Sequence, residues 1–331
     1  MTGTGTPKKA VPQNIDDTEL GRTGVRVPRL GLGAMTWGNP AEIPRWSPAR
    51  LAYGLAGSLE EQQRALDVSI EAGANLVDTA AMYGKGASER RVGKLARGKN
   101  VMVATKFPFR IYSGAGRLPA DLEASLTRLA RVTIDLYQVH YPAAWRPIPR
   151  LMQLMADAVE AGKVRAVGVS NFSAAQMRTA HAVLASRGIP LASNQVQYSL
   201  LHRQPEVDGV IDTCRELGVT LIAYMPLASG ALTGKYTAAV RPSGMRTRMA
   251  FFNQKNQSVL MGVIEILREI GSRYGMSPSQ VALRWLIENG ALPIPGAKTG
   301  EQAAHNARAL SFSLSRSEVE ALSQATLPWR T

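Results

Sequence analysis

The side chains of this sequence that could do chemistry lie at the ends of short β-branched runs, each followed by a helical pattern. Asp78, Lys106 and His140 end three such runs, and Tyr83 comes five residues after Asp78. A phenol has a pKa of about 10, but a neighbouring ammonium stabilises the phenolate and lowers that pKa. We expect Asp78 to hold Lys106 beside Tyr83, which makes Tyr83 a general acid, and His140 to orient a carbonyl oxygen. Such a site suits hydride addition to a carbonyl, and a cofactor must supply the hydride.

Each of these residues also has an ordinary structural explanation. Asp78 could cap the next helix, and Tyr83 could be a packing residue with one hydrogen bond. Lys106 could be a solvated strand end, and His140 a satisfied core histidine. The set favours a functional site because further polar side chains end other runs, namely Ser170 with Asn171, Gln195 and Tyr224.

The elements that must position these residues alternate between strand and helix. Eight strands are expected, at residues 29–35, 74–79, 101–106, 134–140, 164–170, 192–197, 220–225 and 292–295. Helix starts are marked by predicted capping boxes at Ser58 with Glu61 and Ser315 with Glu318, and by Ser277 before a proline.

Strand–helix alternation implies a parallel sheet, which a doubly wound fold and a closed barrel both provide. The dinucleotide-binding pattern Gly-x-Gly-x-x-Gly of the former fails, because Thr36 stands third after Gly31 and Gly33. The count of eight favours a (β/α)8 TIM barrel, whose catalytic groups gather at the carboxyl ends of the strands. Residues 19–27 predict an N-terminal β-hairpin that plugs the bottom of the barrel.

Composition limits the domain organisation and the classes of protein to which the chain can belong. The chain has 331 residues, of which 45% are apolar and 19% charged, so one large folded domain at residues 16–331 is expected after a polar, flexible tail at residues 1–15. No apolar run is long enough for a membrane span. The single cysteine, Cys214, indicates a cytoplasmic protein. No histidine pattern predicts a metal site.

A net charge of +14 raises the question of an anionic partner. Nucleic acid is one candidate, but no base-reading motif is present and we expect none to bind. The distribution is more informative, because residues 217–264 contain no acidic side chain while including Lys235, Arg241 and Arg246. This loop is either an ordinary basic surface loop or a site for an anion such as a phosphorylated small molecule.

The quoted residues and their surroundings resemble the aldo-keto reductase family over nearly the whole chain. The matching segments, in order, are GRTGVRVPRLGLGAM, NLVDTAAMYG, VATK, DLYQVHYP, GKVRAVGVSNFS, NQVQYS, AYMPLASGALTGKY and PIPGAKTGEQAAHNA. The resemblance implies a barrel that opens with an N-terminal hairpin and carries extra C-terminal helices. It is strongest to the bacterial, cyanobacterial and plastid branch, which includes relatives similar to pyridoxal reductases.

The resemblance assigns roles to particular residues. It implies the tetrad Asp78, Tyr83, Lys106 and His140, with NADP(H) as the cofactor. The implied cofactor-binding residues are Met35, Asp78, Ser170, Asn171, Gln195, Tyr224, Met225, Pro226, Leu227, Ser229, Lys235, Gly296, Lys298, Gln302 and Asn306. Relatives often have Arg at the position of Gln302 and Ser at that of Met225, so Lys298 is expected to be the main contact of the 2′-phosphate.

The implied function is NADPH-dependent reduction of an aldehyde or ketone, with pyridoxal and aromatic aldehydes as candidate substrates. Tyr141, Trp145 and the insertion at residues 40–58 could line the substrate pocket, and the first two could equally be surface packing residues. The alternative is a regulatory NADP(H)-binding module like the potassium-channel β subunits, which carry Asn where this chain has His140. The sequence leaves the oligomeric state open.

Overall fold

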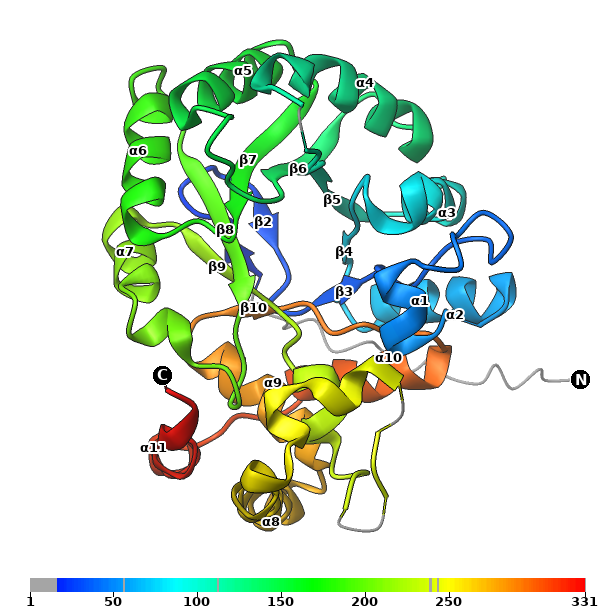
Figure 1. The fold of residues 1–331 in the computed structure, drawn as a ribbon, viewed down its shortest axis with the longest axis vertical. Coiled ribbons are helices and arrows are strands. Elements are labelled where there is room, and N and C mark those ends of the chain that lie inside the picture. The colour runs from blue at the N-terminus through cyan, green and yellow to red at the C-terminus, as the bar shows by residue number, and fades with distance from the viewer. Residues whose placement is uncertain (1–16, 56, 112, 238–239, 243, 331) are drawn as a thin grey trace, which may run out of the picture.

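Eight parallel strands form a barrel in the computed structural model, which describes residues 17–330 apart from 56, 112, 238–239 and 243 (Figure 1). The expected tail at residues 1–15 lies outside the described residues. The strands are β3 (Gly31–Gly33), β4 (Leu76–Asp78), β5 (Met102–Phe107), β6 (Ile134–Val139), β7 (Val164–Ser170), β8 (Leu191–Gln197), β9 (Thr220–Tyr224) and β10 (Leu292–Pro293). Each pairs with the next in chain order, which confirms the predicted (β/α)8 topology.

The barrel closes between its first strand and the segment after its last. The Gly33 amide donates to the carbonyl oxygen of Pro295 at 3.0 Å, and Gly33 forms a parallel bridge with Gly296. A Cβ atom at Gly33 would lie 2.9 Å from the carbonyl oxygen of Ile294. Only glycine lets the two backbones approach this closely.

The predicted N-terminal hairpin is present and consists of β1 (Thr18–Glu19) and β2 (Arg26–Val27). Leu20, Val25 and Val27 are buried in one cluster with the inward-facing side chains of the strands, such as Ile222. The Gly21 amide also donates to Thr220 Oγ1 at 2.7 Å. The hairpin therefore closes one end of the barrel and leaves the carboxyl ends of the strands as the open end.

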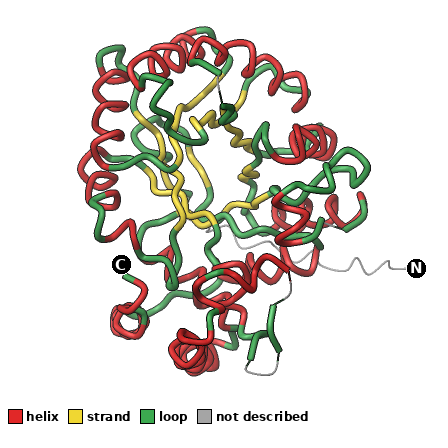
Figure 2. The backbone as a smooth tube through the Cα atoms, in the orientation of Figure 1, coloured by secondary structure: helices red, strands yellow, loops and turns green. Residues whose placement is uncertain are grey.

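Helices cover the outside of the barrel, as Figure 2 shows by the red coils around the yellow strands. They are α1 (Pro48–Tyr53), α2 (Leu59–Glu71), α3 (Ala87–Leu95), α4 (Leu118–Leu129), α5 (Ile148–Glu160), α6 (Ala174–Ala185), α7 (Val210–Leu217), α8 (Gln257–Tyr274), α9 (Pro278–Glu288), α10 (Gly300–Ala307) and α11 (Arg316–Ala325). In α5, the side chains of Leu151, Met152 and Met155 are fully buried on the face toward the barrel.

The helix starts follow the predicted signals with one exception. Ser277 and Ser315 form complete capping boxes, with Gln280 and Glu318 as the reciprocal partners. Ser58 accepts a hydrogen bond from the Glu61 amide as predicted, but no reciprocal bond from Glu61 completes this box. The Glu61 carboxylate instead pairs with Arg64 and accepts from the Gly300 amide.

Candidate active site

A buried ion pair lies at the carboxyl ends of β4 and β5. Lys106 Nζ is 2.6 Å from Asp78 Oδ1 and donates to the carbonyl oxygen of Thr79 at 2.9 Å. Gln195 Nε2 donates to the other carboxylate oxygen at 2.8 Å. Lys106 and Asp78 are 0% and 3% exposed. A charge buried this deeply needs its partner, because an unpaired buried ion costs several kcal/mol, so the pair is fixed in place.

Tyr83 follows β4 at the start of a short 3-10 turn, Tyr83–Gly86, and its ring lies beside the ion pair. Lys106 Nζ is 5.1 Å from the centroid of the Tyr83 ring. Burial raises the pKa of Tyr83 well above its usual value, and the charge of Asp78 adds to this. The direction is opposite to our expectation, because burial disfavours the charged phenolate and the Asp78 carboxylate repels it. The phenol is therefore held in its protonated form.

His140 directly follows β6 and faces the tyrosine. The centroids of the two rings are 5.8 Å apart at an interplanar angle of 83°. Burial lowers the pKa of His140 to about 3, and the nearby Lys106 contributes. The imidazole is thus neutral, and its buried Nδ1 has no hydrogen-bond partner among the described residues. A neutral imidazole can donate one hydrogen bond to a carbonyl oxygen without adding a second positive charge.

A second group of predicted residues forms one hydrogen-bond network beside His140. Tyr224 OH donates to Asn171 Oδ1 at 3.0 Å, and Asn171 Nδ2 donates to Ser170 Oγ at 3.0 Å and to the carbonyl oxygen of His140 at 3.2 Å. Ser170 Oγ in turn donates to the carbonyl oxygen of Gln195 at 2.8 Å. Asn171 has φ 61°, a left-handed conformation that asparagine tolerates well. The structure therefore brings these four residues to the open end of the barrel as predicted.

The loop after β9 has an unusual backbone. Met225, Ala228 and Ser229 all have positive φ, between 46° and 54°. Alternation of left- and right-handed residues can turn successive amides toward one point, which makes a cradle for anions. Pro226 is buried and Leu227 half-buried, so the loop is anchored to the barrel. The resemblance implies that Met225, Pro226, Leu227 and Ser229 of this segment bind the cofactor.

Three cations converge beside that loop. Burial lowers the pKa of the Lys298 ammonium, and the charges of Arg246 and Lys235 lower it further. The guanidinium of Arg246 donates to Tyr236 OH at 2.7 Å, and its buried Nε has no partner among the described residues. An anion in this place would relieve the mutual repulsion of the cations. The residues present therefore fit a phosphorylated cofactor.

Tyr53, in α1, is a residue that our sequence reading missed. Its hydroxyl lies 2.9 Å from Ser229 Oγ and 3.9 Å from Met225 Sδ. Its carbonyl oxygen accepts from Lys298 Nζ. Through Tyr53, α1 thus contacts both the loop after β9 and Lys298. The spacing of apolar residues in the insertion could have predicted a helix. No sequence signal predicts that Tyr53 contacts Ser229 and Lys298, which lie far along the chain.

The other predicted cofactor residues lie on or before α10 and after β3. Gln302 is exposed, and its side-chain oxygen accepts from the Lys298 amide at 2.8 Å. Asn306 is buried and donates to the carbonyl oxygen of Gly296 at 3.4 Å. Met35 is half-buried two residues after β3, and in the described chain no hydrogen bond joins it to the others. Gln302 and Asn306 thus form hydrogen bonds with the backbone of Lys298 and Gly296, just before α10.

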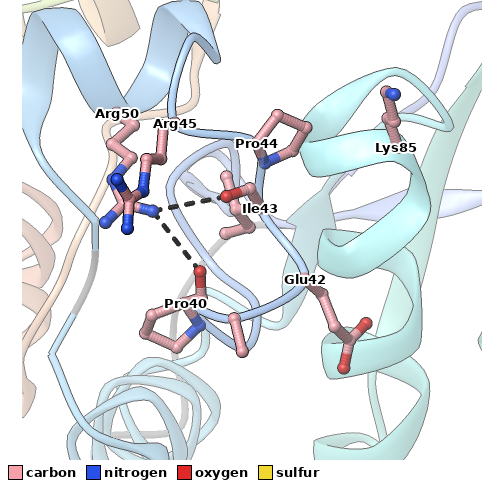
Figure 3. Close-up of a pocket in the computed structure, with 8 residues that line it drawn as sticks. Pro40, Glu42, Ile43, Pro44, Arg45, Arg50 and Lys85 are labelled. Atoms are coloured by element: carbon pink, nitrogen blue, oxygen red, sulfur yellow. Dashed lines mark hydrogen bonds between the residues drawn. The ribbon is translucent and has the colours of Figure 1, made fainter.

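The insertion before α1 supports the tyrosine turn from outside the barrel. It borders a surface hollow of about 590 Å³, with Arg45 and Arg50 on one side and Lys85 on another (Figure 3). Ile43 lines this hollow and also packs under Gly84, where a Cβ atom would come within 2.8 Å of its side chain. No tetrad residue is among those lining the hollow. Through Ile43, the insertion therefore packs against the turn that begins at Tyr83.

Two kinds of feature are absent from the described part of the chain. No helix there is long and apolar enough to cross a membrane. No group of three His, Cys, Asp or Glu side chains comes together there as a metal site.

Comparisons with known proteins agree with this geometry. The model of the "Aldo/keto reductase family" matches residues 29–326. Pyridoxal reductase, chloroplastic, from Arabidopsis thaliana is 37% identical over 311 residues, covering 87% of this chain and 80% of the relative. Aldo-keto reductase yakc [NADP(+)] from Schizosaccharomyces pombe is 32% identical over 319 residues, covering 90% and 88%.

Solved structures give the same result. The glycerol dehydrogenase from Gluconobacter oxydans superposes with a TM-score of 0.79 at 26% identity, covering 93% of this chain and 94% of that one. An aldo-keto reductase from Klebsiella pneumoniae in complex with NADPH superposes with a TM-score of 0.69 at 26% identity, with the same coverage. From its sequence, its barrel and its hairpin, this chain belongs to the aldo/keto reductase family.

Proposed function

We propose that this protein is an NADPH-dependent oxidoreductase that reduces an aldehyde or ketone to an alcohol. The observation that carries the proposal is the buried Lys106–Asp78 pair next to a protonated Tyr83 and a neutral His140. This set presents one proton donor and one neutral hydrogen-bonding ring at the open end of the barrel. It suits a reaction in which a carbonyl oxygen gains negative charge and then a proton.

NADPH, when bound, supplies the hydride for the carbonyl carbon. Tyr83 gives its phenolic proton to the carbonyl oxygen as charge develops there. His140 donates a hydrogen bond to the same oxygen and so fixes its direction. Lys106 then stabilises the phenolate that remains, because its ammonium lies over the tyrosine ring. Asp78 keeps the Lys106 side chain extended and in place.

The residues proposed to hold the cofactor fall into three groups, one for each part of the cofactor. Ser170, Asn171 and Gln195 offer hydroxyl and amide groups suited to a carboxamide, and Tyr224 offers a flat ring whose hydroxyl is fixed by Asn171. Lys298 is proposed to contact the 2′-phosphate, the feature that separates NADPH from NADH. The loop from Met225 to Lys235 is proposed to hold the pyrophosphate.

Pyridoxal and aromatic aldehydes are the proposed substrates. The similarity to a chloroplastic pyridoxal reductase supports the first, and the aromatic side chains around His140 support a planar substrate in general.

The test is oxidation of NADPH, followed by its near-ultraviolet absorbance, with pyridoxal, 4-nitrobenzaldehyde, methylglyoxal and a keto-sugar. Tyr83→Phe is expected to remove most turnover, by about 100-fold or more as for loss of a general acid, and to leave NADPH binding unchanged. Equal loss of turnover and of NADPH affinity would contradict the general-acid role. Tight NADPH binding without turnover of any carbonyl would contradict the proposed reaction.

A further inference from the structure

A rim of aromatic rings extends outward from His140. Tyr141 stacks on His140 with ring centroids 4.9 Å apart and planes 12° apart. Phe109 meets Tyr141 at 5.9 Å and Trp145 at 5.7 Å. Tyr141 is 40% and Trp145 46% exposed. We call Phe109, Tyr141 and Trp145 the aromatic rim.

The rim comes from two separate loops that have to be aligned. Phe109 lies in the loop after β5, whereas Tyr141 and Trp145 lie in the loop between β6 and α5. Loops on a barrel rim are usually the mobile part of the fold. Phe109 is half-buried on one loop, whereas Tyr141 and Trp145 are exposed on the other, so contacts between the two loops must keep the three rings together.

Arg146 provides that link. This side chain is 1% exposed, which is unusual for an arginine. Its partners are carbonyl oxygens of the Phe109 loop: Nε donates to Ser113 at 2.6 Å, Nη1 to Pro108 at 2.9 Å and Nη2 to Arg110 at 3.3 Å. The three carbonyls surround Phe109 in sequence, so one guanidinium fixes the backbone that carries this ring.

Two other contacts hold Arg146 itself. Its guanidinium carbon lies 4.6 Å from the ring centroid of Phe107, the last residue of β5. Its amide donates to the carbonyl oxygen of Ala143 at 2.9 Å, which closes the turn that presents Trp145. Only arginine has a rigid, planar set of donors that can reach three carbonyls at once, and lysine cannot replace it.

We propose that Arg146 is a positioning residue that locks the aromatic rim and thereby gives the enzyme its preference for large planar carbonyl substrates over small ones. The inference rests on the proposed function and names the substrate class of that site. A planar aromatic substrate that reaches from Tyr83 past His140 contacts the rim, whereas a carbonyl compound of three carbons does not extend so far. Loss of the lock therefore affects the KM of the large substrate and leaves the reaction at Tyr83 unchanged.

The experiment compares Arg146→Gln with the unaltered protein on 4-nitrobenzaldehyde and on methylglyoxal. We expect KM for 4-nitrobenzaldehyde to rise about tenfold, the size of one aromatic contact, with KM for methylglyoxal and both kcat values within about twofold. Arg150→Gln is the matched control, because Arg150 is an exposed arginine on α5, and no change is expected. Arg146→Lys is expected to behave like Arg146→Gln.

Two further measurements separate positioning from general structural damage. Trp145→Ala is expected to give the same selective rise in KM, and Arg146→Gln added to it is expected to change KM by less than about twofold, because the effects share one contact. Hydrogen–deuterium exchange of the amides of Phe107, Phe109, Arg110, Ile111 and Ser113 is expected to speed up in Arg146→Gln. If Arg146→Gln does not fold, Phe109→Ala and Trp145→Ala still test whether the rim selects large substrates.

The outcomes are distinguishable. Absence of turnover by the unaltered protein overturns the proposed function. Turnover by the unaltered protein with equal changes for both substrates in Arg146→Gln overturns this inference, as does unchanged exchange of the loop amides at Phe109, Arg110, Ile111 and Ser113. A full additive effect of Arg146→Gln in the Trp145→Ala protein overturns the link between the two residues.

Discussion

The neutral state of His140 predicts how acid destabilises the fold. Burial holds the pKa of His140 at about 3 in the folded protein, whereas an unfolded histidine has a pKa of about 6.5. At a pH between these two values, His140 therefore binds a proton in the unfolded chain and stays neutral in the folded protein. The contribution of His140 to stability is present above pH 6.5 and is lost progressively as the pH falls toward 3.

The magnitude follows from the two pKa values. At pH 5 the unfolded histidine is protonated and the folded one is not, and the difference of about 1.5 pH units from 6.5 corresponds to about 2 kcal/mol. His140 is only 6% exposed, so solvent screening reduces this figure little. His140→Asn removes the proton site and should abolish the effect.

The assay is urea denaturation of both proteins at pH 7, 6 and 5, followed by tryptophan fluorescence. Between pH 7 and 5 the unaltered protein should lose about 2 kcal/mol more free energy of unfolding than His140→Asn. The pKa of His202 is also lowered by burial, but His202 is present in both proteins and cancels in the difference. Parallel loss of stability in the two proteins would refute the reasoning, because it would mean that His140 titrates normally.

Three other substitutions test the ion pair and the cofactor region. Lys298→Ala should weaken the binding of NADPH by about 10- to 100-fold, the value of one charged hydrogen bond, and the binding of NADH by less than about threefold. Equal losses of affinity for the two cofactors in fluorescence titrations would exclude the 2′-phosphate contact. Asp78→Asn should lower the free energy of unfolding by about 3–5 kcal/mol, because Lys106 is left buried without a counter-charge. In urea denaturation, the double variant Asp78→Asn with Lys106→Met should regain part of this free energy. Losses of free energy that simply add in the double variant would refute this. Tyr53→Phe loses the contact with Ser229 and should speed NADPH release about 2- to 10-fold in stopped-flow measurements, whereas an unchanged rate would mean that α1 does not hold the loop.

The strands were predictable because their signal is local. β7 matches its predicted bounds, and β6 differs only in that His140 follows the strand instead of ending it. The meeting of Asp78 and Lys106 was also predictable, because neighbouring parallel strands end at the same side of a barrel. Residue type and strand order are sufficient for this kind of prediction.

The features that were not predictable depend on distances between side chains. The pKa of Tyr83 is raised chiefly because its ring is buried, and the charge of Asp78 adds to this; the sequence gives the residue types without the burial of the phenol. The contacts of Tyr53 with Ser229 and Lys298 join the insertion to segments far away in the chain. Loops of variable length make such contacts, and no periodicity indicates them.

The N-terminal hairpin, which closes one end of the barrel, affects how the protein folds during its synthesis on the ribosome. Its Gly21 is bonded to Thr220, 199 residues later. At a translation rate of about 5–20 residues per second, this partner is made about 10–40 s after the hairpin. During that interval Leu20, Val25 and Val27 have no barrel in which to be buried. The hairpin is therefore made well before the strand to which it docks, and we expect chaperones to bind the nascent protein at this hairpin.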